Sequence, residues 1–298
     1  MSIAKKIYWI ISEKKRRQIE NIFKYSSRTN LANKIIEFYK HNSNLVTNEV
    51  QEVLNFLDSN WCRPFPYSFK DEYNTIKITL KYDNDWPYVI HNEKKMYFKK
   101  SMSEQFVKNN YRALLAEQDN RSPHRYLTTD FKPNKGDIII DVGAAEGIFA
   151  LNHIDNSKKI FIVESDKEWI DALKLTFKPW KEKVEIIHKY ASDISSDSTI
   201  ALDDIYLRNN EVIDFIKMDI EGYEGQVLNG AANLLEKSKK LKLVVCTYHK
   251  QEDAKLFEKL FLNLNYNIEF SKGYMLSIYP TKSSEPYLRR GLIRATKQ

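Results

Sequence analysis

The stretch DVGAAEGIFA, residues 141–150, follows a run of isoleucines and decides the fold. Gly143 and Gly147 provide the tight turn and the close backbone approach that occur where a buried strand leads into a helix. In an open parallel sheet, ligands bind beside such a turn, at the carboxyl ends of the strands. Position 145 is alanine, so the dinucleotide fingerprint is incomplete, and a plain strand-to-helix turn is the alternative interpretation.

Two carboxylates, Asp141 and Glu146, flank the glycines. Phosphate-binding loops offer backbone N–H groups and the positive end of a helix, and a carboxylate in the same place repels an anion. The loop therefore favours a ligand that is positively charged and has no phosphate, which describes S-adenosylmethionine. We expect this cofactor to be bound by the loop residues Asp141, Gly143, Ala144, Glu146 and Gly147.

Beyond residue 135, short apolar runs alternate with helical segments. Strands are expected in DIIIDV, IFIVES, VEIIHKYA, IDFIKMDI and LKLVVCTY, with helices after all but the third, and two closing strands at residues 267–270 and 274–279. Apolar strands that alternate with helices form a parallel sheet covered on both faces. The predicted fold class is α/β, with a doubly wound, mostly parallel sheet.

Two later turns carry further candidate cofactor ligands. The second strand ends in Glu164-Ser165, and a carboxylate there can accept both hydroxyls of a ribose, although the ribose of NAD would fit equally well. The third strand leads to Ser192-Asp193, where a carboxylate can accept the adenine amino group. An ordinary turn or helix cap is the alternative for Asp193.

The substrate that accepts the methyl group is expected to bind where the fourth and fifth strands end. Asp219 and Glu221 fall on one side if the strand continues that far, and Glu221 as a cap of a helix beginning near Tyr223 is the alternative. His249 follows the fifth strand and is suited to take a hydroxyl proton near neutral pH. We therefore predict Asp219, Glu221 and His249 as catalytic residues. No metal is predicted, although a divalent ion at Asp219 and Glu221 is left open.

The first 130 residues form an extension to this sheet. Residues 4–58 have helical spacing, TIKITLKY (residues 75–82) begins a small antiparallel β-meander, and residues 103–117 form a helix capped by Ser103, with Phe106 on its buried face. The loop that follows can close over the site, which makes its polar residues candidates for the lid or the substrate site, together with Tyr223. The loop candidates are Gln118, Ser122, His124 and Tyr126. We divide the chain into residues 1–58, 59–130 and 131–298.

The motifs DVGAAEG, VES, IDFIKMDIEGYEGQVLNGA (residues 213–231) and LVVCTYHKQED (residues 243–253) resemble, in this order and spacing, the FkbM family of S-adenosylmethionine-dependent methyltransferases. The resemblance covers roughly residues 130–280. It implies a class I methyltransferase (Rossmann-like) fold, methyl transfer to a hydroxyl, and frequent association with polyketide or surface-glycan biosynthesis. The chain departs from the family at Ala144-Ala145, where members more often have Ala-Asn.

The composition of the chain limits its cellular location and its partners. The chain has 298 residues, 42% of them hydrophobic and 29% charged, and its two cysteines lack the spacing of a disulfide framework or a zinc site. We expect a cytoplasmic protein, peripheral to the membrane if residues 5–24 dock there. Residues 1–40 contain ten lysines or arginines and three glutamates, and this charge suits nucleic acid, an anionic membrane, an acidic glycan or simply a solvated helix face.

The predicted function is methyl transfer from S-adenosylmethionine to a carbohydrate hydroxyl, in a surface polysaccharide or glycolipid precursor. The expected partner is a small-molecule or glycan acceptor and not nucleic acid, and a homo-oligomer is left open. Two alternatives remain: an NAD-linked α/β enzyme, and a non-catalytic protein that docks on a membrane or a partner.

Overall fold

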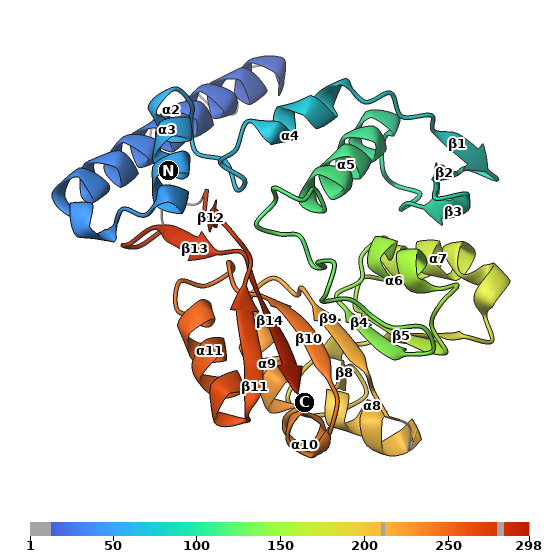
Figure 1. Cartoon of the computed structure of the whole chain (residues 1–298). Helices are drawn as coiled ribbons and strands as arrows, with labels where there is room; N and C mark the ends of the chain where they lie inside the picture. The colour runs from blue at the N-terminus through green and yellow to red at the C-terminus, as the bar shows by residue number, and fades with distance from the viewer. Residues whose placement is uncertain (1–12, 210–211, 279–282, 298) are drawn as a thin grey trace, which may run out of the picture. The chain divides into compact units, whose positions relative to one another are not determined.

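The computed structural model describes residues 13–209, 212–278 and 283–297 (Figure 1). The chain separates into two compact units. One combines Met1–Ser68 with Gly273–Arg289, and the other combines Phe69–Lys272 with Arg290–Gln298. The three-part division of the sequence stays a prediction, because these units follow spatial contacts and not changes in composition.

Two helices are the main elements of the first unit. They are α2 (Glu13–His41) and α3 (Asn48–Asp58), joined through the 3-10 helix η1 (Ser43–Leu45). The Thr47 side chain caps α3 by accepting a hydrogen bond from the Val50 N–H. The buried apolar side chains of the two helices are Leu31, Ala32, Ile35, Tyr39, Val50, Val53, Phe56 and Leu57. The predicted helices are confirmed from residue 13 onward, whereas residues 4–12 and the side chains of the basic segment 5–24 lie outside the described part.

A late segment of the chain returns to this first unit. The strands β12 (Tyr274–Leu276) and β13 (Leu288–Arg290) pair with each other, and the Tyr67 hydroxyl accepts a hydrogen bond of 2.7 Å from the Tyr274 N–H. The strand expected at residues 274–279 therefore does not close the large sheet, and Tyr279 lies outside the described residues. This prediction was wrong because an apolar run gives no indication of which sheet it joins.

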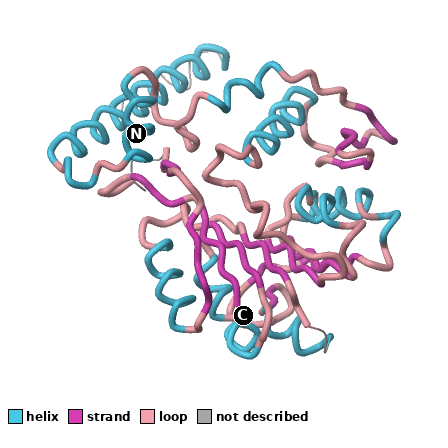
Figure 2. The backbone as a smooth tube through the Cα atoms, in the orientation of Figure 1, coloured by secondary structure: helices cyan, strands magenta, loops and turns pink. Residues whose placement is uncertain are grey.

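The second unit contains a seven-stranded sheet with the order β11-β14-β10-β9-β4-β5-β6. Five strands run parallel, and β14 is antiparallel to both of its neighbours. The strands are β4 (Ile138–Val142), β5 (Lys159–Glu164), β6 (Val184–His188), β9 (Phe215–Met218), β10 (Lys242–Cys246), β11 (Tyr266–Phe270) and β14 (Leu292–Lys297). The predicted doubly wound, mostly parallel sheet is confirmed, and Figure 2 shows its strands between layers of helices. The sequence interpretation missed β14.

Helices cover both faces of this sheet, with a separate apolar core on each face (Figure 1). Successive strand residues alternate between the cores, so that Ile139 lies in one and Ile138 and Ile140 lie in the other. This burial on both faces explains the continuous apolar runs in the sequence. One face carries α5 (Glu104–Glu117), α6 (Ile148–His153) and α7 (Lys167–Thr176); the other carries α8 (Leu202–Asn209), α9 (Glu224–Asn229), α10 (Ala232–Lys237) and α11 (Asp253–Asn263).

The predicted antiparallel meander is present but shorter than expected. Its strands are β1 (Lys81–Asp83), β2 (Trp86–His91) and β3 (Lys94–Tyr97). The strand expected at residues 75–82 has ladder hydrogen bonds only from Lys81 onward. Ile78 and Leu80 are partly buried and pack against the core. Their alternation with polar residues therefore indicates that one side of this segment is buried, and not that the segment pairs with another strand.

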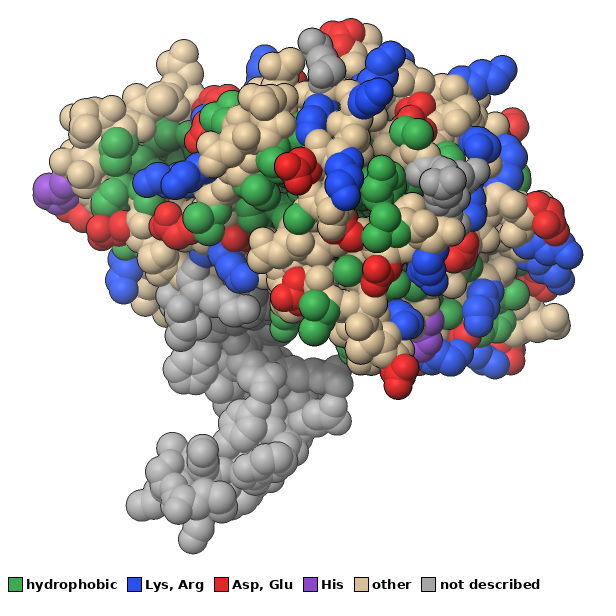
Figure 3. Space-filling view, turned by 90° about the horizontal axis from the view of Figure 1, so that it is seen from below, with side chains coloured by type: hydrophobic (Ala, Val, Ile, Leu, Met, Phe, Trp, Pro, Cys, Tyr) green, Lys and Arg blue, Asp and Glu red, His purple; other side chains and the backbone are tan. Residues whose placement is uncertain are grey.

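Smaller elements complete the second unit. Ser103 caps α5 as predicted, but Phe106 is 56% exposed, so its placement on the buried face was wrong. The remaining short elements are α4 (Phe69–Glu72), η2 (Tyr73–Thr75), η3 (Lys178–Trp180), β7 (Tyr190–Ala191) and β8 (Thr199–Ile200). Within the described ranges, no helix has both the length and the apolar character needed to cross a membrane. On the face drawn in Figure 3, basic and acidic side chains are interspersed.

Candidate active site

The glycine loop connects β4 to α6 and has a tightly restricted backbone. Gly143, Ala145 and Gly147 all have positive φ, at 72°, 47° and 77°. A β-carbon on Gly143 would lie 2.0 Å from the carbonyl oxygen of Asp219, so only glycine fits between the two loops. The loop therefore brings the backbone after β4 against the backbone after β9.

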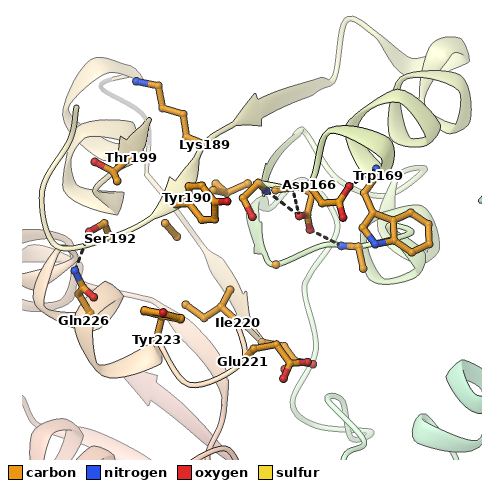
Figure 4. Close-up of a pocket in the computed structure, with 17 residues that line it drawn as sticks. Asp166, Trp169, Lys189, Tyr190, Ser192, Thr199, Ile220, Glu221, Tyr223 and Gln226 are labelled. Atoms are coloured by element: carbon orange, nitrogen blue, oxygen red, sulfur yellow. Dashed lines mark hydrogen bonds between the residues drawn. The ribbon is translucent and has the colours of Figure 1, made fainter. Parts of the chain in front are cut away.

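Glu164, at the end of β5, is held by three backbone N–H groups. One carboxylate oxygen accepts a bond of 2.9 Å from Ala145, and the other accepts bonds of 2.8 Å from Ser165 and Asp166. Figure 4 labels Asp166 and marks hydrogen bonds between the residues drawn as dashed lines. Each carboxylate oxygen can accept more than one hydrogen bond, so the group keeps capacity for hydroxyl donors. Glu164 and Ser165 line a cavity of about 670 Å³, which we call the larger cavity.

The opposite wall of the larger cavity follows β6. Ser192 lines it, and the Asp193 carboxylate accepts hydrogen bonds from the hydroxyl of Ser192 and the amide of Gln226, at 3.0 and 2.8 Å. These bonds hold the pKa of Asp193 below its usual range. Tyr190 and Tyr223 also line the cavity and are each 63% exposed. Glu164, Ser165 and Ser192 thus border one cavity, whereas Asp193 is connected to it through its hydrogen bonds with Ser192 and Gln226.

Asp141 lies behind this wall in a buried ion pair. Its carboxylate is 3.1 Å from the ammonium of Lys217, its register partner in the neighbouring strand β9, and both residues are buried. Burial lowers the pKa of Lys217, but the charges of Asp141 and Asp219 outweigh this effect and raise it. Lys217 also donates a bond of 2.6 Å to the Gly143 carbonyl. Asp141 is therefore placed to fix the loop through Lys217, and its predicted direct contact with the cofactor stays a prediction.

Glu146 lies on the other side of the loop, in a smaller cavity of about 190 Å³. The residue is buried, and this burial raises the pKa of its carboxyl to about 8. Glu117 lines the same cavity, and its pKa is also raised by burial. Both carboxyls therefore lose their protons only at a raised pH, and a nearby positive charge would favour their ionised forms.

Asp219 joins the two cavities, because it lines both of them. Its carboxylate accepts a bond of 2.9 Å from the Tyr126 hydroxyl and lies 3.2 Å from Nε2 of His124. Burial would raise the pKa of Asp219, but the hydrogen bond from His124 and the nearby charges of His124, Lys217 and His249 hold it well below its usual range. The junction of the cavities therefore carries a permanent negative charge.

The loop at residues 118–126 is part of the wall of the smaller cavity. Gln118, His124 and Tyr126 line this cavity, and the Ser122 hydroxyl accepts a bond of 3.1 Å from the His124 N–H. Ser122, His124 and Tyr126 are all buried. The structure thus brings three of the four loop candidates to the site, while the closing movement stays a prediction.

The prediction for Glu221 rested on a strand that ends too early. β9 stops at Met218, Glu221 has a φ of 56°, and its side chain is 90% exposed. Asp219 and Glu221 are therefore not paired by strand alternation. The alternative role for Glu221, a helix cap, is also not observed, because Tyr223 holds the cap position of α9.

The buried acidic partner of His249 is Glu224, which the sequence interpretation missed. The distance between Nδ1 of His249 and Oε1 of Glu224 is 2.7 Å, and Glu224 is fully buried. Nε2 of His249 lies 3.6 Å from Asp219 and 3.7 Å from Glu221, two residues that line both cavities. The imidazole is therefore directed toward the junction.

Two side-chain groups in the described part are close enough to hold a metal ion: His124, Asp219 and Cys246, and Asp219, Glu224 and His249. Burial raises the pKa of the Cys246 thiol well above its usual range, which disfavours the thiolate that binds metals. In the second group, Glu224 is engaged with His249. A divalent ion stays an open alternative.

A parallel sheet with a glycine loop after β4, a carboxylate after β5 and a reversed strand β14 defines the class I methyltransferase fold. Residues 149–274 match the family profile "Methyltransferase FkbM domain". This segment of the chain therefore matches the FkbM methyltransferase domain, and the resemblance seen in the motifs is confirmed. The matched region begins after the glycine loop.

Several solved structures are similar to this chain. The FkbM methyltransferase from Methylobacillus flagellatus is 18% identical, with a TM-score of 0.45, over 65% of this chain and 56% of its own. Precorrin-6y C5,15-methyltransferase from Geobacter metallireducens is 11% identical, with a TM-score of 0.40, over 70% and 97%. M. jannaschii TYW2, solved in complex with AdoMet, is 12% identical, with a TM-score of 0.41, over 74% and 92%. The chain thus spans little more than half of the Methylobacillus protein, and no curated protein matches it.

Proposed function

We propose that this protein transfers a methyl group from S-adenosylmethionine to a hydroxyl of a carbohydrate, in a surface polysaccharide or glycolipid precursor. The observation that carries the proposal is the anionic junction at Asp219, between a larger cavity bordered by Glu164 and a smaller cavity lined by polar side chains. The family supports the methyl transfer. The reaction would take place in the cytoplasm, where the donor is made.

The larger cavity suits the adenosyl part of the donor. Its volume lies in the range of about 300–1,000 Å³ that is usual for small-molecule sites. Glu164 can accept ribose hydroxyls there, and Asp193 can accept the adenine amino group. The positive sulfonium is favoured near Asp219, because opposite charges attract strongly where little water is present.

The smaller cavity suits a hydroxylated acceptor. Gln118, His124, Tyr126 and Tyr248 supply hydrogen-bonding groups around it. Transfer is a single displacement: the acceptor oxygen bonds to the methyl carbon, the carbon–sulfur bond breaks, and the hydroxyl proton moves to Nε2 of His249. Much of the acceleration would come from orientation, where effective molarities of about 10⁵–10⁸ M are reached.

The proposal is tested with tritiated methyl donor and a panel of simple hexosides, nucleotide sugars and matched amino sugars. We expect the label in a methyl ether of a hydroxylated acceptor. Label found only on amines, or on no acceptor while the donor binds, would contradict hydroxyl transfer. Calorimetry with NAD alongside S-adenosylmethionine excludes or supports the NAD-linked alternative.

Replacing His249 by alanine is expected to lower turnover by roughly 10²–10⁴-fold, the usual contribution of a general base. The affinity for S-adenosylmethionine should change little, because His249 contacts the carboxylates at the junction and not the larger cavity. Turnover is measured by S-adenosylhomocysteine release and affinity by calorimetry. His41→Ala, at an exposed position of α2, is the control, and wild-type turnover in His249→Ala would remove this histidine from the mechanism.

The affinity for S-adenosylmethionine is expected to rise with pH between 6 and 8. Burial raises the pKa of Glu146 to about 8, so this carboxyl is largely protonated at neutral pH, and a cationic ligand must displace the proton. The gain is at most about tenfold per pH unit, because one proton is released. Above the raised pKa, the Glu146 contribution levels off.

Calorimetric titrations at several pH values test this dependence. Glu146→Gln should weaken the rise, while Glu182→Gln, on a side chain that is 87% exposed, should leave it intact. The same slope in Glu146→Gln and wild type would show that Glu146 does not face the charge of the cofactor.

A further inference from the structure

His249 and Glu224 form a buried pair whose geometry is fixed from both ends. The same oxygen of Glu224, Oε1, lies 2.7 Å from Nδ1 of His249 and accepts a bond of 3.0 Å from the Ile220 N–H. Glu224 is in the first turn of α9, and Ile220 belongs to the loop that carries Asp219. One carboxylate therefore connects the end of β9, the start of α9 and the imidazole that follows β10.

This contact determines which ring nitrogen faces the junction. A carboxylate accepts hydrogen bonds only, so Nδ1 of His249 carries the proton that bonds Glu224. In the neutral ring, the lone pair then lies on Nε2. Nε2 is 3.6 Å from Asp219 and 3.7 Å from Glu221, which line both cavities, and is therefore the ring nitrogen on the side of the junction.

We propose that Glu224 is a positioning residue for methyl transfer, which holds the His249 ring with Nε2 toward the acceptor hydroxyl. This inference rests on the proposed function. As the new carbon–oxygen bond forms and the carbon–sulfur bond breaks, the hydroxyl proton passes to Nε2. The Glu224 carboxylate lies beside the resulting imidazolium, 2.7 Å from Nδ1.

Several charged groups face the imidazole. Glu224 comes from α9, Asp219 and Glu221 from the loop after β9, and Asp253 from the start of α11. Burial lowers the pKa of His249, but the hydrogen bond and charge of Glu224, followed by the charges of Asp219 and Glu221, outweigh it and raise the pKa. Among these groups, Glu224 is fully buried and lies 2.7 Å from Nδ1 of the ring.

Glu224→Gln separates this role from a merely structural one. Glutamine keeps the volume and an oxygen that can accept from both Ile220 and His249, but it removes the charge. Loss of the charge should lower the midpoint of the His249 titration if the pair forms in solution. A merely structural role predicts unchanged turnover once folding is intact, whereas a role in methyl transfer predicts a lower kcat and a shifted pH profile. Glu252→Gln, an exposed change of the same charge in the same loop region, is the matched control.

The first experiment follows the histidine ring signals by NMR in full-length protein labelled on histidine, as the pH is raised. The chain has six histidines, so the His249 signal is assigned as the one absent from His249→Gln. We expect the midpoint of His249 to fall in Glu224→Gln and to stay at the wild-type value in Glu252→Gln. Equal midpoints in Glu224→Gln and wild type would overturn the inference.

The second experiment measures turnover against pH with tritiated donor and the hydroxylated acceptor that responds in the panel. Glu224→Gln should lower kcat about tenfold or more, with an unchanged KM for S-adenosylmethionine, and should move the rise of activity to lower pH. A thermal melt close to that of wild type shows that the fold is intact. Wild-type kcat and pH profile in Glu224→Gln would overturn the inference, whereas absence of transfer by the wild-type protein would instead overturn the proposed function.

Discussion

Replacing Gly143 by alanine is expected to abolish cofactor binding and to destabilise the fold. The new β-carbon would lie 2.0 Å from the Asp219 carbonyl oxygen and 2.7 Å from the Ile220 side chain. The loops after β4 and β9 would have to separate, which moves Asp219 away from the cavity junction. Overpacking of this kind costs about 1–3 kcal/mol, in addition to about 1–2 kcal/mol for a left-handed backbone at a residue with a β-carbon.

Gly136→Ala is the matched control for this prediction. Gly136 also has a positive φ, of 88°, but a β-carbon there meets nothing within 4 Å. Gly136→Ala should therefore have the energetic cost of a left-handed backbone but not the steric clash. Urea denaturation and calorimetry with S-adenosylmethionine measure the two effects. Equal stability and equal affinity in the two variants would show that close approach at Gly143 is unimportant.

Asp219→Asn is expected to reduce methyl transfer by roughly 10²–10³-fold, the usual effect of removing one preorganised electrostatic group. Asparagine keeps the shape but removes the charge that faces both cavities, and it leaves His124 and His249 without their shared carboxylate. Because the pKa of Asp219 is held well below its usual range, the loss should be nearly independent of pH above about 5. Donor affinity should fall as well.

The stability of Asp219→Asn tests the arrangement separately. Removing one partner of a buried charge pair costs about 3–5 kcal/mol, and the cost should be smaller here because Asp141 still pairs with Lys217. Turnover, calorimetry and urea denaturation are compared with those of Asp197→Asn, which changes the same charge at an exposed position. Transfer within a few-fold of wild type would contradict the central role of Asp219.

The sheet could be predicted because its strands are buried on both faces. The isoleucines of β4 supply both cores in alternation, so the run is apolar throughout and bounded by turn residues. Glu164 could be predicted for a related reason: a carboxylate directly after such a strand reaches the ligand edge. These features depend on local sequence and on one general rule of sheet topology.

Lys217 was missed although the sequence carried a signal for it. A lysine inside the apolar run DFIKMDI must meet a buried negative charge, and Asp141 lies in the neighbouring strand. Recognising the pair requires the strand order and the register that set Asp141 beside Lys217. Neither can be read from one strand alone.

Glu221 and Glu224 show two ways in which prediction from the sequence pattern failed. The prediction assumed that strand β9 continues past Met218, with side chains on alternate sides. Glu221 and Gly222 both have positive φ, so the chain turns there and Glu221 points to solvent. Glu224 meets His249 across 25 residues, through the packing of α9 beside the end of β10. The burial of Glu224 depends on tertiary packing, and the spacing of residues in the sequence does not predict it.

The chain connectivity also sets the order in which the protein can fold during its synthesis. The first unit needs residues 273–289, and the central sheet of the second needs β14, which lies between β10 and β11. N-terminal domains usually fold first, while the rest of a chain is still being made. Here the residues up to Ser68 must wait for Gly273–Arg289, so a ribosome that stalls before Gly273 releases a chain in which neither unit is complete.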